Sequence, residues 1–313
     1  MIKNWTKTEF EQEAYKMLYN NSIVFLKDGI ERLVNKDRGD EDLIDHDLLA
    51  LTCTSFQISL ELAIKALIIE RDGIRCILNS KQQKLGDEEI ESLLKENKLN
   101  TLDFEAQKNF IKSKNYIQDL SRDEFNVIEE FQLYRNRIVH FSFKFCEGDL
   151  FDLKYDIIYY LIHVIFKVLL SRKHQDEKPS EFLEYSLGSP LHKRLMHYPP
   201  YVYAMEKLAR DNSDQVFKCI VCNNRTFSQD EDYCYCCNFS TELYSMIDCD
   251  YCGAKRSVIY DNLDIELNNN EMKGLCLNCD NDGIVFQCPK CGEAHNIETR
   301  FESVCTHNKC INE

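Results

Sequence analysis

The stretch "LLALTCTSFQISLELAIKALII", residues 48–69, contains two charged residues, Glu61 and Lys65. Its pattern predicts a helix from about residue 47 to residue 70, and so few charges leave no face that is well suited to solvent. Most faces of this helix must therefore be covered by other parts of the chain. We expect it to be the central core helix of an α-helical domain.

Segments on both sides of this helix also favour helices. A first helix is expected over residues 8–34, where "TEFE" at its start has the pattern of a capping box. A polar stretch, 87–117, predicts one or two short helices, and longer helices are expected over 122–140 and 152–172. No part of this region alternates as a strand does. Residues 1–175 are therefore predicted to form a mainly α helical bundle.

Prolines mark the end of this bundle. Four of the five prolines fall in one short region: Pro179, Pro190, Pro199 and Pro200. Because proline interrupts helices and favours turns, we predict a Pro-containing linker over residues 176–215, with one short helix over 201–210.

Cysteines dominate the rest of the chain. Thirteen of the 16 cysteines fall between Cys219 and Cys310, and most of them form C-x-x-C pairs. The N-terminus, "MIKNWTKTEFEQEAY", lacks the apolar segment of a signal peptide, so we expect a reducing, cytoplasmic compartment. In such a compartment metal binding explains the pairs better than disulfide bonds do.

The pairs form three sets that repeat after roughly 30 to 40 residues. The sets are Cys219, Cys222, Cys234 and Cys237; Cys249, Cys252, Cys276 and Cys279; and Cys288, Cys291, Cys305 and Cys310. Four thiolates from two tight turns are the usual ligands of structural Zn²⁺. We therefore predict up to three structural zinc ions in small β-rich modules over residues 216–313, which resemble tandem zinc ribbons.

Two of the sets leave a choice of ligand. In the first, the pair Cys234–Cys237 keeps the two-residue gap of a tight turn, so we expect Cys236 to be the spare thiol. In the third, four residues separate Cys305 from Cys310, and His307 between them could replace either one. The sequence does not decide that second choice.

Closed four-cysteine sets have no open coordination position, so we expect these metals to stabilise the fold rather than to catalyse. Each such zinc centre carries a charge of about −2. The only basic doublet in this region is Lys255–Arg256. This composition favours a partner-binding or sensing surface over a general RNA clamp in the zinc-ribbon region.

The charge of the whole chain limits its contacts with nucleic acid. The formal net charge is −15, with 30 basic and 37 acidic residues up to residue 215 and 8 basic and 16 acidic residues after it. Nonspecific coating of nucleic acid needs a broad basic surface, which neither part offers. Any contact with RNA must therefore be local.

One such local site is suggested by "YRNRIVHF", residues 134–141. Its charged side chains could simply be solvated or paired with nearby glutamates. On a helix, however, Asn136 and His140 are four residues apart and share a face, while Arg135 lies about 140° away from His140. A single helix cannot easily direct both at one small target, whereas two copies meeting across a two-fold axis can. The spacing therefore suggests a site at a dimer interface.

The hexapeptide "RNRIVH" matches the R-N-x-x-x-H signature of the HEPN superfamily, a helical-bundle fold with many metal-independent ribonucleases of toxin and defence systems. The core helix "SFQISLELAIKALII" and the later helix "DIIYYLIHVIFKVLL" also resemble this family. The resemblance covers about residues 8–172. It implies an endoribonuclease of toxin or antiviral-defence type, active as a homodimer and using no metal for catalysis.

The resemblance also assigns roles by position. The family's catalytic arginine corresponds to Arg135, its adjacent polar residue to Asn136 and its histidine to His140, while Arg137 stands at a variable position. An acidic residue of an earlier helix approaches this site in many family members, and Glu61 lies in the matching helix. The alternative for Glu61 is an i,i+4 ion pair with its helix neighbour. The implied products are a 2′,3′-cyclic phosphate and a 5′-hydroxyl.

Two other functions stay open. The helical domain could be a non-catalytic dimerisation module, with zinc ribbons that bind nucleic acid or protein in a regulatory complex. Zinc-dependent catalysis is disfavoured because the cysteine sets are closed. We expect no membrane span at the apolar run from Ile157 to Phe166, which is too short to cross a bilayer.

Overall fold

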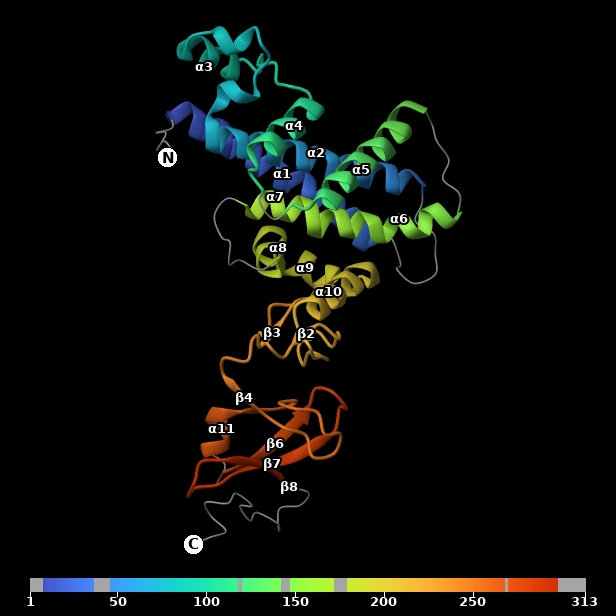
Figure 1. The fold of residues 1–313 in the computed structure, drawn as a ribbon, viewed down its shortest axis with the longest axis vertical. Coiled ribbons are helices and arrows are strands. Elements are labelled where there is room, and N and C mark those ends of the chain that lie inside the picture. Colours follow the sequence, from blue (N-terminus) through green and yellow to red (C-terminus); the bar gives the residue numbers. More distant parts are fainter. Residues whose placement is uncertain are drawn as a thin grey trace. The chain divides into compact units, whose positions relative to one another are not determined.

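A computed structural model describes residues 8–36, 46–117, 120–141, 147–171, 179–267 and 270–297. The chain divides into two compact units, Met1–Tyr201 and Val202–Glu313 (Figure 1). The first unit is helical and the second is rich in β-strands. The predicted fold class, a helical bundle followed by small β-rich modules with cysteine clusters, is therefore confirmed.

The helical unit begins with two long helices and continues with shorter ones. They are α1 (Glu9–Lys36), α2 (His46–Asp72), the 3₁₀ turns η1 (Ile74–Ile77) and η2 (Gln82–Lys84), α3 (Asp87–Lys95), α4 (Phe104–Lys114), α5 (Arg122–Phe141), α6 (Glu147–Tyr160), the π-helical turn η3 (Leu161–Ile165), α7 (Phe166–Leu170), α8 (Pro179–Leu187) and α9 (Ser189–Leu195). α10 (Pro199–Asp211) lies across the boundary between the units.

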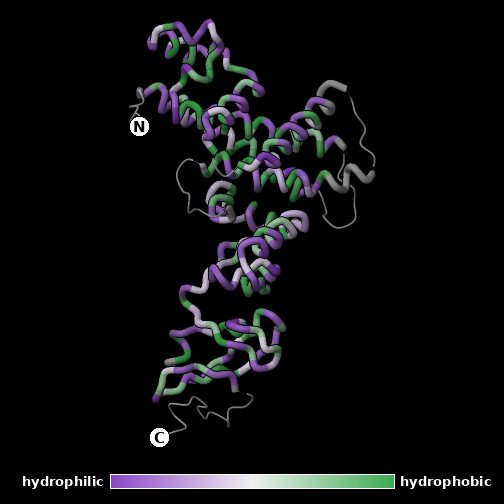
Figure 2. The backbone as a smooth tube through the Cα atoms, viewed as in Figure 1, coloured by the Kyte–Doolittle hydropathy of each residue, from purple (hydrophilic) through white to green (hydrophobic). Residues whose placement is uncertain are grey.

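The helix α2 is the core helix that the sequence predicts. By length and composition it could cross a membrane, but 78% of its most apolar window is buried inside the protein. Packing against neighbouring helices therefore accounts for its apolar character. Figure 2 shows the surrounding helices as alternating hydrophobic and hydrophilic segments, as expected of amphipathic helices that cover such a core.

The helices α1 and α2 form an antiparallel pair with a close contact at Gly29. Ser59 Oγ donates a hydrogen bond to the carbonyl oxygen of Ser22 at 2.8 Å, and Ser55 Oγ donates to the Asp28 carboxylate at 2.7 Å. A Cβ atom at Gly29 would lie 2.4 Å from the Cε1 atom of Phe56. The absence of a side chain at this position therefore permits the observed helix separation.

We expect Gly29→Ala to destabilise the helical unit by about 1–3 kcal/mol, because the added methyl group overpacks the contact with Phe56. Elsewhere in a helix, glycine to alanine stabilises by about 1 kcal/mol, so the direction of the change is diagnostic. Denaturant unfolding gives the free energy. The double variant Gly29→Ala/Phe56→Leu should recover part of the loss, and a stabilising Gly29→Ala would contradict the contact.

The ring of Tyr160 joins three helices of the core. It stacks on Phe131 of α5 with ring centroids 3.9 Å apart, and its hydroxyl donates a hydrogen bond to Gln57 of α2 at 3.2 Å. Both rings are buried. Because Phe131 is one helical turn before Arg135, these contacts hold the segment of α5 that leads into the Arg–Asn–His motif.

Other helix predictions are confirmed, with one difference of detail. The polar stretch 87–117 contains the two short helices α3 and α4, and the helix predicted over 122–140 is α5. The helix predicted over 152–172 is interrupted by the π-helical turn η3, which separates α6 from α7.

The region predicted as a linker, 176–215, is more ordered than expected. It contains three helices, α8, α9 and α10, and its side chains of Leu183, Leu195 and Tyr201 are fully buried. The prolines lie in the first turns of these helices, where a missing N–H costs nothing and the fixed φ angle favours helix. They begin helices here instead of ending them. The predicted short helix over 201–210 corresponds to α10.

The second unit contains two antiparallel sheets. The first has the order β1-β2-β3 and the second the order β4-β5-β6-β7-β8. The strands are β1 (Val216–Phe217), β2 (Phe227–Ser228), β3 (Tyr233–Cys234), β4 (Tyr244–Ile247), β5 (Val258–Asp261), β6 (Glu271–Cys276), β7 (Asp282–Gln287) and β8 (Ala294–Ile297), with the helix α11 (Asn262–Leu267) after β5.

The sheet arrangement shows how the predicted Cys-rich modules are connected. The first cysteine set has its own three-stranded sheet, but the second set and the first pair of the third share the five-stranded sheet. The strand β7 pairs with β6 on one side and β8 on the other. A small core of six buried residues supports this sheet: Cys249, Val258, Tyr260, Ile265, Cys276 and Val285.

Candidate metal centres and the Arg–Asn–His helix

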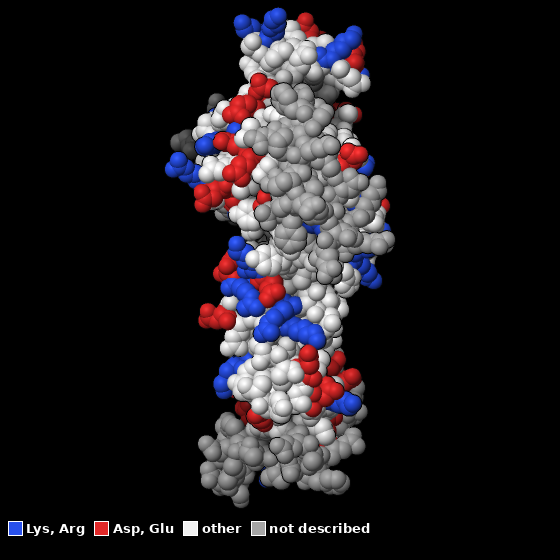
Figure 3. All heavy atoms as spheres, turned by 90° about the vertical axis from the view of Figure 1, so that its right-hand side faces the viewer, with Lys and Arg blue, Asp and Glu red and all other residues white. Residues whose placement is uncertain are grey.

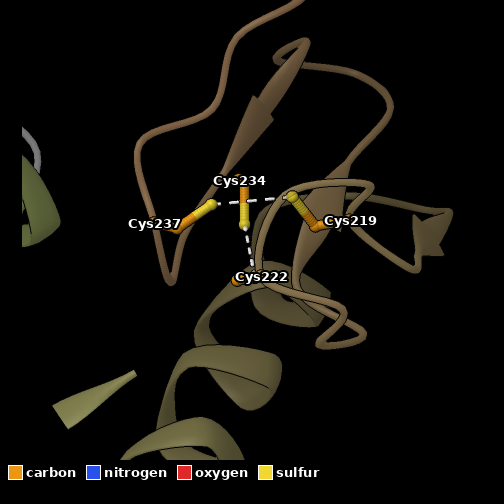
Figure 4. Close-up of side chains that lie close together, drawn as sticks. All are labelled: Cys219, Cys222, Cys234 and Cys237. Carbon is orange, nitrogen blue, oxygen red and sulfur yellow. Dashed lines mark hydrogen bonds between the residues drawn. The ribbon is translucent and has the colours of Figure 1, made fainter. Parts of the chain in front are cut away.

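The first cysteine set converges on one point (Figure 4). The sulfur atoms of Cys219 and Cys237 are 3.6 Å apart, and those of Cys222 and Cys234 are 3.7 Å apart. Four sulfurs at about 2.3 Å from a tetrahedral Zn²⁺ would be separated by about 3.8 Å. A disulfide would need about 2.05 Å instead. This spacing therefore fits a metal centre.

The second set has the same arrangement. The Cys249 and Cys279 sulfurs are 4.0 Å apart, the Cys252 and Cys276 sulfurs are 3.8 Å apart, and all four lie within 4.8 Å of one another. The backbone N–H of Ala254 lowers the pKa of the Cys252 thiol to about 6. Because the thiolate is the form that binds metal, this hydrogen bond prepares the ligand at neutral pH.

The turns that carry these cysteines share one backbone geometry. In each, the N–H four residues after the first cysteine donates to that cysteine's carbonyl, and the first cysteine's own N–H donates to the carbonyl five residues on. The residue after the second cysteine has a positive φ angle, which favours Asn, Asp and Gly. These residues are Asn223 (64°), Asn238 (65°), Gly253 (72°), Asp280 (57°) and Gly292 (76°).

The last of these turns belongs to the third set. Gly292 N–H donates to the Cys288 carbonyl at 2.8 Å, and Cys288 N–H donates to the Glu293 carbonyl at 2.9 Å. The turn Cys288–Cys291 thus has the geometry of the four turns that form the two clusters. The other predicted ligands, Cys305 and Cys310, and the alternative His307 lie outside the described residues.

Neighbouring polar groups contact the sulfur atoms. Thr226 Oγ1 lies 3.2 Å from the Cys234 sulfur, and Ser257 Oγ lies 3.4 Å from the Cys276 sulfur. The Asn278 amide donates a hydrogen bond to Cys252 Sγ at 3.6 Å. Such outer contacts orient ligands and stabilise thiolate charge. The sequence did not predict these outer contacts. It does contain a signal for the turns themselves, which is the Asn, Asp or Gly that follows every C-x-x-C pair.

The two cysteine clusters are joined by their turns. Lys218 N–H donates to the Leu277 carbonyl at 3.1 Å, and its ammonium pairs with Asp280 at 3.0 Å. Leu277 N–H in turn donates to the Ser257 carbonyl at 2.7 Å. Lys218, which precedes Cys219 of the first cluster, therefore contacts the turn Cys276–Cys279 of the second cluster.

The structure also distinguishes Cys236 from Cys237. Cys237 belongs to the four-sulfur cluster, whereas Cys236, although fully buried, accepts a hydrogen bond from the Asn224 amide at 3.3 Å. This agrees with the expectation that Cys236 is the spare thiol of the first set.

A matched pair of variants tests this distinction. We expect Cys237→Ala to lose one equivalent of metal, and Cys236→Ala to keep the full content, because only the former removes a ligand. Native mass spectrometry of the two proteins gives the stoichiometry. Equal metal loss in both variants would mean that Cys236 can serve as a ligand.

The Arg135–His140 motif lies in the last turns of α5, as predicted, with Asn136 half-buried. The side chains of Arg135 and His140 lie outside the described residues. Glu61 forms the ion pair with Lys65 at 2.8 Å, with its side chain 34% exposed. That contact is the structural alternative to a role for Glu61 in RNA cleavage, which stays a prediction.

Charge on the surface is mixed. On the face shown in Figure 3, acidic and basic side chains of the described residues are interspersed. No family model matches this chain, and neither a curated protein nor a solved structure is similar to it.

Proposed function

We propose that this protein is a metal-independent endoribonuclease of the HEPN type whose second unit is stabilised by zinc. The observation that carries the proposal is the position of the Arg135–His140 motif. It lies on a long helix, α5, that packs through Phe131 and Tyr160 against the core helix α2 and the following helix α6. This order of helices is the one that the sequence resemblance implies.

The proposed chemistry needs no metal. His140 acts as a general base or acid on the 2′-hydroxyl or the leaving 5′-oxygen, a role that imidazole fills most often. Arg135 holds the phosphate and stabilises the charge that develops on it. Asn136 orients the imidazole or the phosphate. Because Arg135 and His140 lie on different faces of one helix, a homodimer would assemble the cleft from two copies of α5.

Zinc is the metal we propose for the two cysteine clusters, since tetrahedral four-thiolate sites are typical of structural Zn²⁺. A third ion would occupy the Cys288–Cys291 turn. Its other ligands would come from Cys305, Cys310 or His307.

The biological role we propose is that of a cytoplasmic toxin or antiviral-defence nuclease. The zinc-binding unit would then sense a trigger or bind an antitoxin, and the proposed site for RNA would be confined to the helical unit. The acidic balance after residue 215 supports a protein partner for the second unit.

Cleavage of RNA by the full-length protein in EDTA, followed by mapping of the ends, tests this proposal. Products with 2′,3′-cyclic phosphate and 5′-hydroxyl ends would support it. If EDTA stopped cleavage while the metal of the cysteine clusters and the helical signal persisted, a second, exchangeable metal would be indicated as the catalyst. Absence of cleavage across structured, single-stranded and transfer RNA would favour the non-catalytic dimerisation module.

A further inference from the structure

A cavity of about 440 Å³ lies beside the second metal centre. It is bounded by the first turn of that centre, by β5 and by the β7–β8 hairpin. Its lining residues are Cys249, Asp250, Tyr251, Val258, Asn281, Asp282, Gly283 and Asn296. Only Cys249 and Val258 of this set are buried, so the cavity has a closed floor and an open rim.

The side chains at this rim offer acceptors that the protein does not use. Within the described part of the chain, the carboxylates of Asp250 and Asp282 form no hydrogen bond or ion pair, and both are exposed. Asn296 donates its amide N–H to the Asp248 carbonyl, which leaves its Oδ1 atom as an acceptor near Gly283. Tyr251 and Asn281 supply neutral donors to the lining, but it contains no cationic one.

The electrostatic potential of the cavity is negative. Cys249 supplies one thiolate of a four-thiolate centre that carries about −2 when zinc is bound. Lys255 is already paired with Asp248 at 2.6 Å, and Lys218 with Asp280 at 3.0 Å. No basic side chain is among the lining residues.

Size and shape select the class of ligand. A bare metal ion would leave most of the cavity empty, and no group of three or more metal-ligating side chains in the described residues includes both Asp250 and Asp282. A guanidinium group can donate to two carboxylates at once. Tyr251, which is 79% exposed, can stack on such a planar cation.

We propose that this cavity binds an arginine side chain of a partner protein. Nucleic acid is disfavoured because its phosphates would meet two carboxylates and the thiolate centre. The proposal names the chemistry of the partner suggested for the second unit. It rests on metal loading of the second centre and does not depend on ribonuclease activity.

Fluorescence anisotropy with full-length, metal-loaded protein tests this proposal. The probe is a fluorescein-labelled glycine–serine heptapeptide with two arginines, and the comparison peptide carries citrulline, which keeps the shape but lacks the charge. We expect the arginine probe to bind, and both the citrulline probe and the variant Asp250→Asn/Asp282→Asn to weaken binding by about tenfold or more.

The control variant is Glu242→Gln/Glu293→Gln, which removes the same two charges from exposed positions outside the cavity. It should alter the affinity by less than about twofold, because exposed charges outside the cavity are screened by salt. If the two double variants weakened binding equally, the binding would depend on net charge alone, and the proposal would be overturned. Absence of binding to wild-type protein with full metal content would overturn it as well. Measuring the metal content of every variant shows whether a loss of binding comes instead from loss of metal at the second cluster.

Discussion

Replacing His140 by alanine is expected to lower the rate of RNA cleavage by about 10²–10⁴-fold, the range that a positioned general acid or base contributes. Without an imidazole, neither the 2′-hydroxyl nor the leaving oxygen has a group that titrates near neutral pH. Arg135→Ala should lower the rate by about 10²–10³-fold, because it removes donors to the charged transition state. Initial rates on one labelled RNA give both values.

Arg137→Ala is the matched control for these two variants. It removes a positive charge from the same turn of α5, but at a position that varies in the motif. We expect its rate to stay within about threefold of wild type, since a charge with no assigned role in the motif contributes little to a specific site. If all three variants lost activity equally, α5 would bind RNA by charge alone. Sedimentation of each variant shows whether the oligomeric state persists.

Replacing Cys276 by serine is expected to remove one equivalent of metal and to unfold the five-stranded sheet. Binding of a structural zinc provides about 10–16 kcal/mol, as much as the whole stability of an ordinary domain. The core of this sheet has six buried residues, and two of them, Cys249 and Cys276, are themselves ligands. Hydrogen exchange of residues 244–297 and native mass spectrometry measure the two effects.

The helical unit should respond differently. Exchange in α1 and α2 is expected to be unchanged by Cys276→Ser, because these helices belong to the other compact unit. The first metal centre should weaken, since Lys218 N–H loses the carbonyl of Leu277 as its fixed acceptor. Cys76→Ser, at a free half-buried thiol, is the control and should keep all metal. Retention of the sheet without its metal would refute this account.

Local chemistry explains why the sequence predicted which cysteines gather in the two described clusters. A tight turn needs only two cysteines at a fixed short spacing, and that information is contained within four residues. The long helices were equally predictable, because the capping pattern near Thr8 and the few charges of residues 48–69 are local signals. The same holds for Cys236, since the spacing alone separates it from Cys237.

Features that depend on distant parts of the chain were not predictable. The prolines at 179, 190 and 199 led to the prediction of a linker. From sequence alone, a proline in the first turn of a helix cannot be distinguished from a proline in a loop. The close approach at Gly29 requires knowledge of which residue of α2 faces it. Pairing of β7 with two neighbours likewise merges cysteine sets that sequence periodicity presents as separate.

Strand β7 has a consequence for how the length of this region can change. It connects a C-x-x-C turn that ends at Cys279 to another that begins at Cys288, with eight residues between them. Side chains of a strand alternate between faces, so inserting or deleting one residue would turn the second pair of sulfurs to the opposite face of the sheet. Adding two residues would keep the face and move the turn by about 7 Å. Changes in length between these cysteines should therefore be tolerated in even numbers only.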